Sequence, residues 1–418
     1  MKLKSFFSGD AFSVIRIPNL RYFLFYRFVV TTATLMQSVV VSWQLYSITK
    51  NVLSLGLIGL TEVIPQISIA LLAGHFVDIW NRKKIIFYAT MLLLIGSMIL
   101  FTYSIPVLHC YALFGTIPIF ITVFLTGFVR GILSPAHTAF LGQLVPRELL
   151  ASAATWNSTN WQVAAVTGPA IGGLVYGFAG IIPAYFLVFL LFLISLILIL
   201  NVKNVRTFIV SDGGEGILAR IHEGVRFVFN NQILLGAFSL DMFAVLFGGA
   251  IAMLPVFASD ILRVGPEGLG LLRAAPAIGA IIMSVNLTFH PPVKNTGHYL
   301  MFCTAGFGLC MIAFAISANY YLSVLILILS GAFDNMSVVI RASILQLFTP
   351  DQMRGRVAAV NSIFIGSSNE LGAFESGVTA RLMGLIPSVV FGGIMTLLVV
   401  GTAAKKAPLL RRLSLKNK

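Results

Sequence analysis

Long apolar runs separated by short polar segments extend along the whole of this 418-residue chain. A helix that crosses a bilayer needs roughly 20 mostly apolar residues, and the runs reach that length repeatedly. The pattern predicts twelve spanning helices, at about residues 21–48, 53–78, 84–106, 112–143, 151–178, 181–202, 228–260, 266–288, 298–318, 320–347, 354–380 and 383–403. We therefore expect an all-α membrane protein.

The composition supports a membrane protein and argues against an enzyme. The chain is 58% apolar and only 10% charged, whereas soluble domains are about 45–50% apolar and about 25% charged. Its three cysteines and six histidines have no metal-ligand spacing. It also lacks a glycine-rich phosphate loop followed by Lys-Ser or Lys-Thr. We expect no metal, no cofactor and no ATP-driven step.

The net charge of +14 indicates an orientation in the membrane rather than binding to nucleic acid. With the predicted spans, 21 Lys and Arg lie on one side, and only Lys50, Arg263 and Arg381 lie on the other. Because basic loops stay in the cytoplasm, both termini are expected there. The basic side should also contact anionic lipids.

The longest polar connection divides the chain into two predicted halves. We expect a first six-helix bundle at 1–202, a cytoplasmic linker at 203–226 and a second bundle with a basic tail at 227–418. Residues 217–229 mix apolar and charged positions, which favours a helix lying at the membrane interface. A weak repeat supports the division, because Pro146 and Pro350 are followed at the same distance by Asn157 and Asn361.

Two short motifs carry a family resemblance. The segment 74–84 lies between two apolar runs and combines one acid with three bases, and the segment 167–173 reads Thr-Gly-Pro-Ala-Ile-Gly-Gly. The first resembles the loop between helices 2 and 3 of major facilitator superfamily transporters, and the second resembles the antiporter motif of helix 5. The resemblance implies a cytoplasmic gate at Gly74, Asp78, Arg82 and Lys83, and a helix 5 motif at Gly168, Pro169, Gly172 and Gly173.

The resemblance also extends to a branch of that superfamily. Segments 146–150, 168–173, 224–227, 349–356 and 369–372 occur in the order seen in bacterial drug:proton antiporters, including the enterobactin exporter and macrolide efflux proteins. It implies two six-helix bundles of the major facilitator fold in the cell inner membrane. It further implies a monomer that exports a small amphiphilic compound, a siderophore or a drug-like molecule, in exchange for protons. A lipid or lysolipid flippase, an uptake transporter and a channel remain alternatives.

Charged and polar residues inside the spans are the candidates for the transport site, because such residues are costly in hydrocarbon and usually face an interior cavity. The proton-coupling candidates are four acids, Glu62, Asp241, Asp334 and Glu370. The substrate-cavity candidates are Arg27, Thr34, Gln37, Arg130, Arg273, Asn361 and Asn369. Glu62 and Arg273 occupy corresponding positions in segments 59–65 and 270–276 of the two halves. Four arginines within the spans suggest that the cavity accepts anionic groups, and His137 is expected to be a hydrogen-bonded packing residue.

Overall fold

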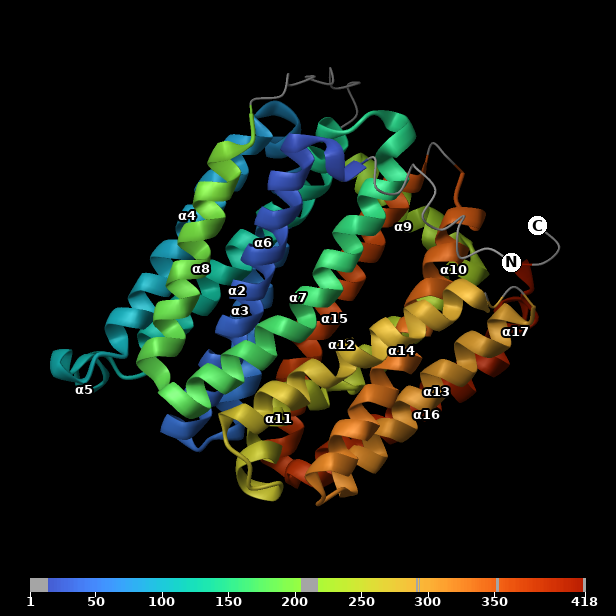
Figure 1. Cartoon of the computed structure of the whole chain (residues 1–418). Helices are drawn as coiled ribbons and strands as arrows, with labels where there is room; N and C mark the ends of the chain where they lie inside the picture. Colours follow the sequence, from blue (N-terminus) through green and yellow to red (C-terminus); the bar gives the residue numbers. More distant parts are fainter. Residues whose placement is uncertain (1–13, 204–216, 291, 293, 351–352, 416–418) are drawn as a thin grey trace. The chain divides into compact units, whose positions relative to one another are not determined.

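The computed structural model of the chain describes residues 14–203, 217–290, 292, 294–350 and 353–415, apart from some side chains within helices. No strand occurs in these ranges, and most of the described residues are helical (Figure 1). The chain divides into two compact units, Met1–Val41 with Ile64–Asp212, and Ser42–Val63 with Gly213–Lys418. The predicted all-helical membrane protein is confirmed.

The first two long helices contribute residues to both units. These are α2 (Pro18–Thr49) and α3 (Val52–Ile79). The first unit also contains η1 (Val14–Arg16), α4 (Arg82–Tyr103), η2 (Pro106–Leu108), α5 (Cys110–Phe114), α6 (Ile117–Leu144), η3 (Arg147–Leu149), α7 (Leu150–Ala179) and α8 (Ile181–Asn201). Within it, α4 packs against α6 and α8.

The second unit contains the remaining helices. They are α9 (Ile217–Asn230), α10 (Gln232–Phe247), η4 (Gly249–Met253), α11 (Leu254–Val256), η5 (Phe257–Ile261), α12 (Pro266–Phe289), α13 (Thr296–Ile316), α14 (Tyr320–Phe348), α15 (Arg354–Met383), α16 (Leu385–Lys406) and α17 (Pro408–Arg411). Within this unit, α14 packs against α12 and α13, and α16 packs against α13. The expected interfacial segment is the helix α9, whereas linker residues 204–216 lie outside the described ranges.

Two predicted spans differ from the observed helices at their ends. The span predicted at 112–143 begins at Ile117, because Gly115 adopts a positive φ of 54° and Pro118 stands at the start of α6. The span predicted at 228–260 begins at Gln232 and is interrupted at Gly249. A Cβ on Gly249 would lie 2.5 Å from the carbonyl oxygen of Gly372, so the missing side chain lets η4 approach α15 closely.

Eleven helices of the described chain are long and apolar enough to cross a membrane. The remaining predicted span is α15, which has 30 residues. At a rise of about 1.5 Å per residue, this helix is also longer than the hydrocarbon core of a bilayer is thick. Its sequence is more polar because it carries Asn361, Asn369, Glu370 and Glu375. A polar helix among apolar ones is expected to face a cavity or other helices rather than lipid.

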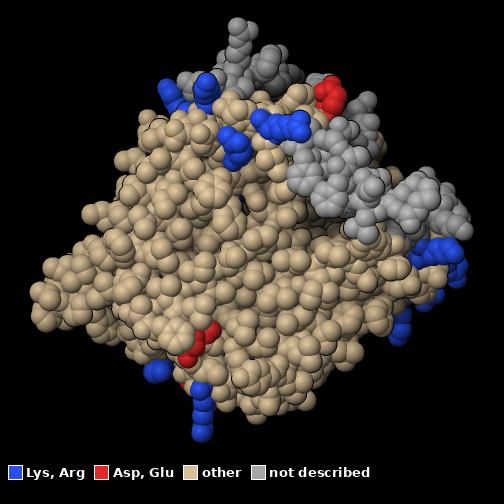
Figure 2. All heavy atoms as spheres, viewed as in Figure 1, with Lys and Arg blue, Asp and Glu red and all other residues tan. Residues whose placement is uncertain are grey.

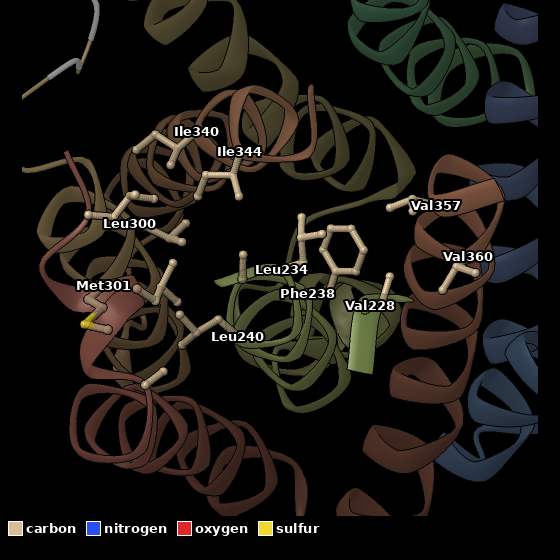
Figure 3. Close-up of a cluster of buried hydrophobic side chains, with 14 residues drawn as sticks. Val228, Leu234, Phe238, Leu240, Leu300, Met301, Ile340, Ile344, Val357 and Val360 are labelled. Carbon is tan, nitrogen blue, oxygen red and sulfur yellow. The ribbon is translucent and has the colours of Figure 1, made fainter. Parts of the chain in front are cut away.

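Charged side chains are sparse on the face that Figure 2 shows, and its Lys and Arg, in blue, lie mostly toward the top, the bottom and the right of the view. Inside the second unit, apolar side chains of α10, α13, α14 and α15 point toward one another (Figure 3). Phe238 and Leu300 belong to this cluster and are almost fully buried. Because lipid is as apolar as these side chains, close packing rather than exclusion of water holds such helices together within a bilayer.

Candidate functional site

A charged cluster in the second unit centres on Arg273 of α12. The Nη2 atom of Arg273 donates a hydrogen bond to Ser42 Oγ at 3.4 Å, and its Nε is buried without a hydrogen-bond partner. Two carboxylates interact electrostatically with this guanidinium, first Glu370 of α15 and then Glu62 of α3. The cluster therefore unites three sequence-predicted residues from three helices.

Glycines explain how α3 comes close to α15. A Cβ on Gly59 would lie 2.5 Å from the carbonyl oxygen of Glu370, and a Cβ on Gly56 would lie 2.9 Å from the Cα of Gly377. Small residues spaced in this way let two helix backbones approach closely. Glu62 follows Gly59 by three residues, so it lies on the same side of α3, near Glu370.

A second polar contact joins the end of α2 to η5 within the same unit. The Tyr46 hydroxyl donates a hydrogen bond to Asp260 Oδ2 at 2.5 Å. The ammonium group of Lys50 lies 5.3 Å from the centre of the Tyr46 ring, within reach of a cation–π interaction. Together with the α3–α15 contact, this hydrogen bond ties residues 42–63 to the second unit.

A small cavity inside the second unit holds two further predicted acids. Asp241 and Asp334 line it, with Cys303, Thr304 and Ser337 from neighbouring helices. Its volume is about 10 Å³, about the space that one water molecule needs and far below the range of about 300–1,000 Å³ of most ligand pockets. Asp241 forms an ion pair with Arg341, and both side chains are less than 10% exposed. This cavity suits water or a small ion better than a drug-sized cargo.

In the first unit, a polar network surrounds Arg27 of α2. Arg27 Nε donates to Asn157 Oδ1 of α7 at 3.1 Å, and Arg27 Nη1 lies 2.5 Å from His137 Nδ1 of α6. The Tyr26 hydroxyl contacts His137 Nε2 at 3.0 Å and Thr90 Oγ1 of α4 at 2.9 Å. His137 is therefore hydrogen-bonded, as expected, whereas its link to Arg27 was not foreseen.

The chemistry of these groups determines which atom donates and which accepts in each hydrogen bond of this network. Arginine can only donate, so His137 Nδ1 must accept and the imidazole carries its proton on Nε2. Nε2–H then donates to the Tyr26 oxygen, and Tyr26 donates to Thr90. Thr90 in turn donates to the Ile86 carbonyl at 2.8 Å. The imidazole is thus neutral in this arrangement.

The predicted helix 5 motif lies where α7 packs closely against α2. A Cβ on Gly168 would lie 2.8 Å from the carbonyl oxygen of Thr32, and one on Gly172 would lie 3.0 Å from Met36 Cγ. Pro169 and Gly173 are also buried in α7. The two glycines lie one turn apart and let α7 pack directly against α2.

The bases of the predicted gate donate to main-chain carbonyls in the first unit. Arg82 donates to Val77 at 3.3 Å and to Ala139 at 3.2 Å, and Lys83 donates to Leu200 at 3.0 Å and to Val202 at 2.6 Å. Cations near the carbonyl ends of α3 and α8 are favoured because those ends carry partial negative charge. Gly74 and Asp78 lie within α3, and the surroundings of Gly74 and the side chain of Asp78 lie outside what the structure describes.

The other predicted cavity residues are dispersed. Thr34 donates to the Val30 carbonyl at 2.8 Å, and Asn369 donates to the Ile365 carbonyl at 2.9 Å, both within their own helices. Gln37 is buried and donates to Thr126 at 3.4 Å. Arg130 is exposed on α6, and Asn361 is partly buried on α15.

Comparison with known proteins points to transporters. Residues 10–415 match a family of proteins described as transmembrane secretion effectors. The fold is similar to a D-xylose–proton symporter, with a TM-score of 0.74 and 14% identity over 97% of this chain and 100% of that one. It is also similar to a POT family transporter in complex with 5-aminolevulinic acid, with a TM-score of 0.74 and 12% identity over 94% of this chain and 96% of that one.

A bacterial homologue of the iron transporter ferroportin, in an inward-facing state, is a further structural neighbour. Its TM-score is 0.70 at 17% identity, over 96% of this chain and 100% of that one. At these identities the likeness concerns the fold alone. Among curated proteins, none matches the sequence significantly.

Proposed function

Since this chain belongs to the transmembrane secretion effector family of the major facilitator superfamily, we propose that it exports a small amphiphilic compound in exchange for protons. The family and the fold make it a multi-pass membrane transporter rather than an enzyme. The finer proposal concerns direction, coupling and cargo. A siderophore or a drug-like molecule is the proposed cargo, carried from the cytoplasm through the inner membrane.

The cluster of Arg273, Glu62 and Glu370 is the observation that carries the proposed proton coupling. With both carboxylates ionised, these three groups sum to one negative charge. Charge within a spanning segment is costly, so one proton on either glutamate balances the cluster. A carboxyl that takes up a proton in one access state and releases it in the other couples two fluxes without covalent chemistry.

Residues 42–63 would change their contacts during each transport cycle. They meet α15 through Gly56 and Gly59, and η5 through the Tyr46–Asp260 hydrogen bond. We propose that these contacts close the end of the transporter that carries the loop between α2 and α3. The loss of the Glu62–Arg273 attraction on protonation of Glu62 would weaken the same contacts. Proton binding and opening of this gate would thereby be linked.

Reconstitution into liposomes tests this proposal. A thermal-shift screen of a catecholate siderophore, a macrolide and a lysophospholipid first identifies a cargo, because ligands stabilise the state that they bind. Vesicles with an acidic interior should then accumulate that cargo, and an uncoupler should abolish the accumulation. Accumulation driven by an alkaline interior would indicate an uptake symporter, and stabilisation by the lysophospholipid alone would indicate a flippase.

A further inference from the structure

Arg27 is a positive charge in a spanning helix, and its partners among the described residues are all neutral. Its two hydrogen bonds go to the amide oxygen of Asn157 and to the ring nitrogen of His137. No carboxylate pairs with it among the residues that the structure describes. Elsewhere in the spans, Arg341 pairs with Asp241, and Arg273 interacts with Glu62 and Glu370. Arg27 therefore differs from Arg341 and Arg273 in having no carboxylate partner within the described part of the chain.

The network orients Arg27 without neutralising it. Because His137 Nδ1 accepts from Arg27, the imidazole is held in the neutral form, and its far side is occupied by Tyr26 and Thr90. The guanidinium uses Nε and Nη1 for these bonds and makes no hydrogen bond through Nη2 to any described residue. Arg27 and Asn157 are both only partly buried. The donors of Nη2 thus remain for a group that enters from outside the protein.

We infer that Arg27 binds an anionic group of the cargo, so that the transported compound belongs to the class of amphiphilic anions. A partly buried cation without a counter-ion is unfavourable, and an incoming anion would supply the missing charge. A planar guanidinium suits carboxylates and similar oxyanions because it offers parallel N–H donors. This inference names the substrate class and rests on the proposed transport function.

Three naphthalene probes with the same ring test the charge preference: naphthoate, naphthamide and naphthylmethylammonium. Binding to the purified full chain in detergent is measured by thermal shift at neutral pH, with no proton gradient. Naphthoate should stabilise the wild type most. Arg27→Gln should weaken naphthoate binding at least about tenfold, the expected loss of a charge-assisted hydrogen bond, while Arg27→Lys should retain part of the preference. Arg226→Gln on the exposed face of α9 is the matched control.

A second pair of variants leaves Arg27 in place. His137→Glu supplies the missing counter-charge and should abolish the preference for naphthoate, whereas His137→Gln keeps a neutral acceptor and should preserve it. Equal stabilisation by all three probes, by none of them, or most strongly by the ammonium compound would overturn the assignment. So would a naphthoate preference that survives both Arg27→Gln and His137→Glu. This binding test is independent of coupling, so transport without proton coupling would contradict only the proposed function.

Discussion

Replacing Arg341 by methionine should lower the free energy of unfolding by about 3–5 kcal/mol, which is the usual cost of leaving one partner of a buried ion pair alone. Asp241 and Arg341 are both buried between α10 and α14, and Asp334 lines the same cavity. Without the guanidinium, two carboxyl groups would share a small space with no cation. The measurement is thermal and denaturant unfolding of the purified protein in detergent.

The double variant Asp241→Leu with Arg341→Met separates this pair from a general packing effect. Removing both charges leaves no unpaired group, so the double variant should be more stable than Arg341→Met alone. Arg21→Met replaces an arginine that is exposed near the start of α2 and should have little effect. The single variant Asp241→Leu completes the comparison. If the stability lost by the double variant equals the sum of the losses of Asp241→Leu and Arg341→Met, the two side chains are not coupled.

Replacing Arg273 by glutamine should reduce gradient-driven transport by more than about tenfold, the largest functional effect that we expect. The change leaves Glu62 and Glu370 without the cation that interacts with both. Ionising either glutamate would then become more costly, so the cluster should retain its proton in both access states. Cargo exchange without a gradient should survive better than net transport, because exchange does not require proton release.

Arg273→Lys keeps the charge and should recover part of the transport, whereas Arg381→Gln, at the exposed end of α15, serves as the control. Glu62→Gln and Glu370→Gln should each weaken coupling, and the stronger effect identifies the proton carrier. Neutral variants of Asp241 and Asp334 should instead affect stability. If Arg273→Gln transports cargo along the gradient as fast as the wild type, this cluster has no part in the coupling mechanism.

The helices were predictable because apolar runs of membrane length leave few alternatives. All twelve predicted spans correspond to long helical segments, and the main differences arise at Gly115 and Gly249. At Gly115 the positive φ of glycine ends the preceding segment, and at Gly249 close packing against α15 interrupts the helix. Neither effect can be read from the length of an apolar run. The polar α15 was still predictable as a helix from its length and its flanking segments.

Partnerships between charges were harder to predict because they depend on which helices pack together. The sequence named Asp241 as a candidate, but only the packing of α10 with α14 pairs it with Arg341. The repeat did carry a signal for Glu62 and Arg273, since it placed them at corresponding positions and the structure brings them within electrostatic range. The Arg27–His137 contact had no such signal, because both residues lie in the first half and the repeat between the halves does not relate them.

Coupled exchange of cargo and protons is tested most directly by cargo-driven proton movement. Liposomes containing the purified protein are loaded with cargo and an entrapped pH-sensitive dye, then diluted into cargo-free buffer of the same pH, with the membrane potential clamped by potassium and valinomycin. We predict that cargo leaving the vesicles will draw protons inward and acidify the interior, and that the Glu62→Gln, Glu370→Gln double variant will show cargo efflux without this acidification. An unchanged interior pH during cargo efflux from wild-type vesicles, or an alkaline shift, would contradict the account.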